Sequence, residues 1–87
     1  MKIEVSPVPP QKMLAICDFF RSYGVSVHFN AESGIGEFES VAGYGWFSHY
    51  KGTLLVFIEQ NRGHFPERMI RGGLRQAVEE IVDRVVE

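Results

Sequence analysis

Apolar residues recur along the chain with two spacings, one of about two residues and one of about 3.6 residues. The first spacing predicts strands, and the second predicts helices with one apolar side. The segments with strand spacing are 2–8, 25–30, 35–47 and 53–60, and those with helical spacing are 10–23 and 66–87. The order β-α-β-β-β-α predicts one α+β domain over residues 1–87, with an antiparallel sheet and two helices packed on one face.

The hairpin turns predict which residues of segment 35–47 face the helices, because a shift of one residue reverses every side chain. A turn at 31–34 pairs Phe29 with Gly36, and a turn at 49–52 pairs Trp46 with Leu54. Both registers turn the same alternate residues inward, namely Phe38, Ser40, Ala42, Tyr44 and Trp46. With the helical stripes, they predict a core that includes Ile16, Phe20, Val27, Phe38, Trp46, Val56, Leu74, Val78 and Ile81.

The same registers leave a group of apolar and glycine positions on the sheet face away from the helices. The group is Val41, Gly43, Gly45, Phe47, Leu55 and Phe57. One interpretation is that the large side chains lean over the bare glycines and shield them. The other is a flat apolar patch that forms a partner-binding site. Because both helices are committed to the opposite face, we expect a homodimer packed sheet to sheet, or a stable partner at the same place.

Arginines gather in the first half of the last helical segment and acidic residues in the second half, the reverse of what the helix dipole favours. Arg68, Arg71 and Arg75 lie along one stripe beside the apolar side, and Arg62 precedes them. These four residues are candidates for contact with an acidic partner or an anion, in which case they affect binding more than stability. The alternative is a solvated rim that includes an ion pair between Arg75 and Glu79.

Two adjacent glycines, Gly72 and Gly73, lie inside the same helical segment. Glycine costs about 1 kcal/mol relative to alanine at such a position. The pattern therefore leaves open whether the helix begins at Pro66 or at Gly73.

The composition is that of a globular protein, with 45% hydrophobic and 23% charged residues among 87 and a net charge of −2. The acidic balance argues against a generic nucleic-acid binder. No apolar run approaches the roughly 20 residues of a membrane-spanning helix, and the first residues lack the apolar stretch of a signal peptide. The single cysteine excludes an intramolecular disulfide and a cysteine-rich zinc site. We therefore expect a cytoplasmic protein that does not associate with membranes.

No motif for catalysis, metal binding or phosphate binding is found in the chain. Cys17 falls on the apolar side of the first predicted helix, where a buried structural thiol is expected. His28 is placed opposite Glu37 on neighbouring strands, and His49 and His64 fall in loops without a second ligand at metal spacing. We therefore predict no catalytic residue, no metal site and no cofactor.

These features favour a non-enzymatic module of the adaptor or inhibitor type, which binds a protein or a second copy of itself. The predicted sites are the open sheet face and the arginine stripe. An alternative is a binder of a small apolar ligand held between sheet and helices. RNA binding by stacking on the sheet is a third possibility, against which the acidic residues of that face count, namely Glu37, Glu39 and Glu59.

Overall fold

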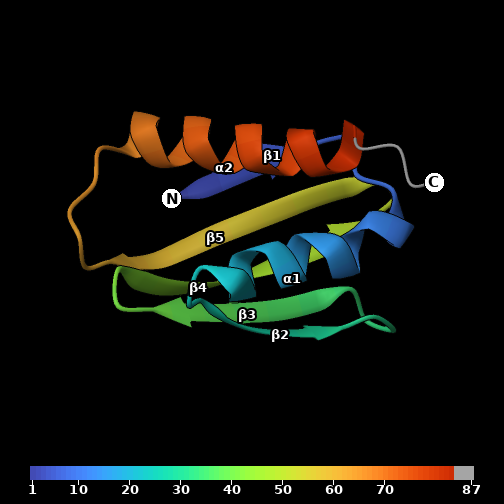
Figure 1. The fold of residues 1–87 in the computed structure, drawn as a ribbon, viewed down its shortest axis with the longest axis horizontal. Helices are drawn as coiled ribbons and strands as arrows, with labels where there is room; N and C mark the ends of the chain where they lie inside the picture. The colour runs from blue at the N-terminus through green and yellow to red at the C-terminus, as the bar shows by residue number, and fades with distance from the viewer. Residues whose placement is uncertain (84–87) are drawn as a thin grey trace.

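The computed structural model describes residues 1–83 and shows an α+β fold, a five-stranded antiparallel sheet with two helices packed on one face (Figure 1). The elements are β1 (Lys2–Val5), the 3-10 turn η1 (Pro10–Lys12), α1 (Met13–Ser22), β2 (Ser26–Asn30), β3 (Ile35–Ser40), β4 (Gly43–Tyr50), β5 (Thr53–Asn61) and α2 (Glu67–Asp83). The strands lie in the order β1-β5-β4-β3-β2. This confirms the predicted fold class. The last part of the predicted helical segment, 84–87, lies outside the described residues.

The segment 35–47, expected as one strand, is divided between β3 and β4 by a turn at Val41 and Ala42. The sheet consequently has one strand more than the pattern predicts. The amide of Ala42 donates to the Ser40 hydroxyl (3.1 Å), and the Ala42 carbonyl accepts from the amide of Arg62 (2.8 Å). These hydrogen bonds satisfy the backbone polar groups of Ala42 in the turn, although neither Val41 nor Ala42 is a typical turn residue.

The β2–β3 register is confirmed, since Phe29 pairs with Gly36 and Val27 with Phe38. The β4–β5 register is wrong, because Trp46 pairs with Phe57 rather than with Leu54. The turn is shorter than expected: Tyr50 already pairs with Thr53. Its two central residues, Lys51 and Gly52, have φ angles of 50° and 77°, and tight hairpin turns with two positive φ angles fit the twist of paired strands.

The partner of Trp46 is thus three positions from the expected one, and an odd shift turns every side chain of β4 to the other face. Phe47 faces the helices and is buried, and its ring stacks on Phe29 with centroids 5.7 Å apart. Trp46 faces away from the helices and is 38% exposed, so its predicted place in the core is wrong.

The rest of the predicted core is confirmed. Five of its residues are buried, namely Ile16, Val27, Val56, Val78 and Ile81. Three more are partly buried and pack against the buried cluster, namely Phe20, Phe38 and Leu74. Met13 and Leu54 are also buried, on the sides that the pattern predicts, and sequence reasoning missed Ile3, Val5, Val8 and Phe47. The core therefore lies between the sheet and both helices.

Gly45 lies beneath an aromatic ring on the helix-facing side of the sheet, as does Gly36. A Cβ atom at Gly36 would lie 2.3 Å from the Phe47 ring, and one at Gly45 would lie 2.8 Å from the Phe38 ring. Rings thus cover these glycines, but on the face opposite to the one predicted for Gly45.

The register predicts unequal roles for neighbouring aromatic residues. Phe47→Ala should lower the free energy of unfolding by about 3–5 kcal/mol, because it removes a buried ring. Trp46→Ala should cost much less in the monomer, since its ring is partly in water. Urea unfolding at low protein concentration measures both, and a larger loss for Trp46→Ala would contradict the register.

The helix α2 begins at Glu67 and passes through Gly72 and Gly73 without interruption, which settles its start. No other group lies within 4 Å of a Cβ atom at either glycine. Gly72→Ala and Gly73→Ala should therefore each raise the free energy of unfolding by about 0.5–1 kcal/mol, because alanine favours the helix. Gly36→Ala is the matched control and should lower the free energy of unfolding. The packing would be contradicted if Gly36→Ala stabilised the protein while Gly72→Ala destabilised it.

Candidate functional site

The sheet face away from the helices, which we call the outer face, carries a row of neighbouring side chains across all five strands. In the order β1-β5-β4-β3-β2 the row is Lys2, Phe57, Trp46, Glu37 and His28. The Trp46 and Phe57 rings are stacked, with centroids 4.1 Å apart and planes 13° apart. The indole N–H of Trp46 donates to the Glu59 carboxylate at 3.0 Å. The centre of this face is thus aromatic, and carboxylates lie beside it.

The structure divides the six residues predicted for a partner-binding site. Leu55 and Phe57 lie on the outer face as expected, and both are partly exposed. Phe47 and Gly45 face the helices instead, because of the register described above. The other two lie at the β3–β4 hairpin: Val41 in its turn, 96% exposed, and Gly43 at the start of β4.

Sequence reasoning missed two aromatic residues of the outer face, Trp46 and Tyr44. Tyr44 pairs with Glu39 of β3, and the Arg62 guanidinium lies 5.4 Å from the centre of its ring. A two-residue turn at Lys51 and Gly52 is the signal that would have placed both on this face.

Two of the four candidate arginines close one edge of the sheet. Arg71 donates to the Lys2 carbonyl at 2.9 Å, and Arg75 donates to the Glu4 carbonyl at 3.0 Å. Both carbonyls belong to the edge strand β1, whose outward backbone groups would otherwise be open to pairing with another chain. Arg71 also pairs with Glu67, whereas no ion pair joins Arg75 to Glu79.

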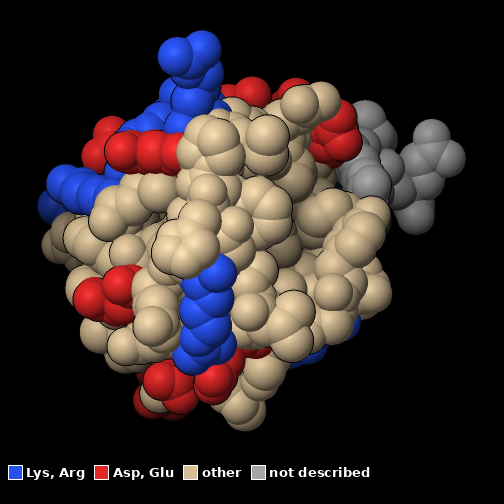
Figure 2. All heavy atoms as spheres, turned by 90° about the vertical axis from the view of Figure 1, so that its left-hand side faces the viewer, with Lys and Arg blue, Asp and Glu red and all other residues tan. Residues whose placement is uncertain are grey.

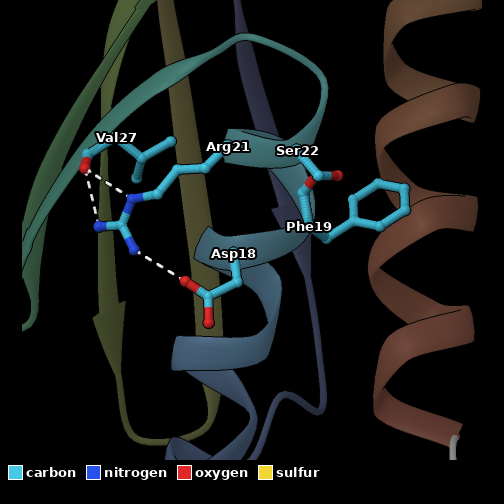
Figure 3. Close-up of polar contacts among 5 residues, drawn as sticks. All are labelled: Asp18, Phe19, Arg21, Ser22 and Val27. Atoms are coloured by element: carbon cyan, nitrogen blue, oxygen red, sulfur yellow. Dashed lines mark hydrogen bonds and ion pairs between the residues drawn. The ribbon is translucent and has the colours of Figure 1, made fainter.

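Arg21 plays the same part at the opposite edge (Figure 3). Its guanidinium reaches from the last turn of α1 to the Val27 carbonyl of β2, with Nε and one terminal nitrogen at 3.1 and 2.8 Å. The other terminal nitrogen pairs with Asp18 at 3.0 Å. Each helix thus fastens an edge strand through arginine.

The remaining two candidate arginines differ in their contacts. Arg62 donates to the Ser40 carbonyl at 3.0 Å and lies 3.6 Å from the Glu39 carboxylate. Arg68 is exposed, and no hydrogen bond or ion pair joins its side chain to another described residue. Contact of the four arginines with an acidic partner or an anion stays a prediction, and Arg68 is the one whose charged group the described residues leave unpaired.

An apolar chamber of about 220 Å³ lies between α1, α2 and the sheet. Its deep end is lined by buried residues, among them Met13, Cys17, Leu54, Val56 and Val78. Its other end is lined by partly exposed residues, among them Phe20, Val25, Ser40, Ile58, Ile70 and Leu74. The lining therefore passes from buried residues at one end to partly exposed residues at the other.

Cys17 is buried on the core side of α1, as predicted. Burial raises the pKa of its thiol, an effect that nearby Asp18 increases and Arg21 opposes. A raised pKa leaves less of the reactive thiolate at neutral pH.

Two of the histidines lie in strands. His28 lies opposite Glu37, as expected. His49 belongs to β4 rather than to a loop, and its Nε2 lies 2.6 Å from the Val8 carbonyl oxygen.

Within residues 1–83, no three His, Cys, Asp or Glu side chains are grouped to hold a metal ion. Neither helix there has the length and apolar character that crossing a membrane requires. In comparisons with known proteins, no family model, no curated protein and no solved structure matches the chain.

The edge contacts predict that Arg71 and Arg75 act on stability, in contrast to the expectation from the stripe alone. The double variant Arg71→Gln, Arg75→Gln should lose up to about 1 kcal/mol of unfolding free energy per residue, because each removes a hydrogen bond to a backbone carbonyl. Arg68→Gln is the matched control and should unfold like the wild type in urea. Equal midpoints for all three proteins would show that the edge contacts add nothing.

Proposed function

We propose that the protein is a non-enzymatic cytoplasmic module that self-associates through its outer face. The observation that supports this proposal is the Trp46–Phe57 stack, with centroids 4.1 Å apart. It lies on a face that neither helix covers, and Trp46 is 38% exposed there. A second copy would remove these rings from water.

Burial of this pair would supply much of the binding free energy. A large side chain moved from water into a packed interface contributes roughly 1.5–3 kcal/mol, and tryptophan is enriched among the residues that dominate interfaces. Leu55 lies on the same face and extends the apolar area. A small domain has little stability of its own, so association also benefits the fold.

The charges across the outer face favour one arrangement of two copies. Lys2 lies at one end of the central row and Glu37 near the other, with Trp46 in the middle strand. A two-fold axis along β4 places the Trp46 rings of the two copies against each other and brings Lys2 of each copy over His28 of the other, one strand from Glu37. Such an interface is self-complementary, as a symmetric dimer requires.

The carboxylates on the outer face favour protein over nucleic acid as the partner. Glu37, Glu39 and Glu59 lie on or beside the face that RNA would use for stacking, and they would repel its phosphates. Exposed aromatic rings alone would suit either partner, so the charge is what decides between them.

Phe57→Lys should convert a dimer into a folded monomer, because it puts a charge into the centre of the interface. Sedimentation equilibrium over a concentration series measures this, with circular dichroism as the check on folding. Leu14→Lys is the matched control, since Leu14 is 67% exposed on α1, on the other side of the sheet. It should leave the dimer unchanged.

A charge exchange tests the arrangement itself. Lys2→Glu and Glu37→Lys should each weaken the dimer, and the two together should restore it. A wild-type chain that stays monomeric at several hundred micromolar would contradict self-association, and RNA binding that Trp46→Ala abolishes would favour the nucleic-acid alternative.

A further inference from the structure

We propose that the apolar chamber is a binding site for a small, uncharged, hydrocarbon-like molecule. The chamber lies on the helix side of the sheet, so the site is independent of self-association through the outer face. An apolar cavity of about 150 Å³ holds benzene. By the same ratio, the volume of about 220 Å³ fits roughly nine non-hydrogen atoms, such as one aromatic ring with a short chain.

The lining determines the chemistry of the ligand. Among residues 1–83, fifteen side chains line the chamber; fourteen of them are apolar, and Ser40 is the exception. The Ser40 hydroxyl already accepts from the Ala42 amide at 3.1 Å and lies 3.5 Å from the Gly43 carbonyl. A charged ligand would therefore lose its hydration and gain no ionic partner from the lining. Water binds weakly in the chamber for a similar reason: a bound water needs two to four polar contacts, and the lining offers few polar groups.

The partly exposed lining residues show where a ligand enters. Phe20 lies near the end of α1, Ser40 ends β3, Ile58 lies toward the end of β5, and Ile70 lies near the start of α2. The parts of α1, β3, β5 and α2 that carry these positions lie toward one end of the molecule (Figure 1). We place the mouth of the chamber at this end, where β5 leads into α2.

The surface around this mouth is rich in exposed apolar side chains. Of the nine large exposed apolar residues in the described part of the chain, four belong to segments at this end, namely Tyr23, Val41, Phe65 and Met69. Figure 2 views the molecule from this end: uncharged residues make up most of the surface, and a Lys or Arg side chain crosses its middle. The exposed apolar side chains give this end the chemistry expected of an entrance to an apolar site.

Propylbenzene, with nine non-hydrogen atoms, is the probe, and 3-phenylpropylamine, which carries a positive charge, is its matched control. We expect propylbenzene to raise the melting temperature and to slow the reaction of Cys17 with an uncharged thiol reagent. Cys17 lines the deep end and is the only cysteine of the sequence, so a bound ligand covers the one thiol that the reagent can label. At ten times its Kd, the ligand should slow labelling about tenfold, because only the free fraction reacts. The amine should do neither.

Substitutions in the lining of the chamber test whether propylbenzene binds there. Leu74→Trp places a larger side chain in the mouth and should abolish both effects, with Ile70→Phe as the second variant if the first does not fold. Leu14→Trp lies outside the chamber and should retain both effects. Phe57→Lys should also retain them, which separates this proposal from self-association. The proposal is overturned if propylbenzene changes neither quantity up to its solubility, if the amine acts equally, or if folded Leu74→Trp still responds.

Discussion

The two-residue turn between β4 and β5 is the constraint on which both proposed surfaces depend. Positive φ angles at Lys51 and Gly52 close the hairpin so tightly that Tyr50 pairs with Thr53. The register that follows turns Phe47 toward the helices and Trp46 away from them. A single backbone feature thus assigns one aromatic residue to the core and its neighbour to the outer face.

The chain fastens both edges of its sheet to its own helices. Arg21 binds the outward carbonyl of Val27 in β2, and Arg71 and Arg75 bind those of Lys2 and Glu4 in β1. Occupied edge carbonyls make strand addition by another chain less favourable. This favours the flat outer face, rather than an edge, for the self-association that we propose.

The fold class could be predicted from the sequence because periodicity identifies helices and strands directly. The β2–β3 register was also accessible, since Gly34 marks its turn and Val27 alternates cleanly with its neighbours. The turn at Val41 was not, because the alternation continues through it without a typical turn residue. The side-chain contacts of Arg71 and Arg75 were equally hidden, because they join residues about 70 positions apart in the chain.

The chamber and the orientation of the outer face both require the observed β4–β5 register, so the ring contact that defines it is the most direct test. Nuclear Overhauser spectroscopy on the isotope-labelled protein measures which side chains lie near the Trp46 indole. The structure predicts strong contacts with the Phe57 ring, whose centroid lies 4.1 Å away. Contacts of the indole with Leu54 and the core residues of the helices would contradict it.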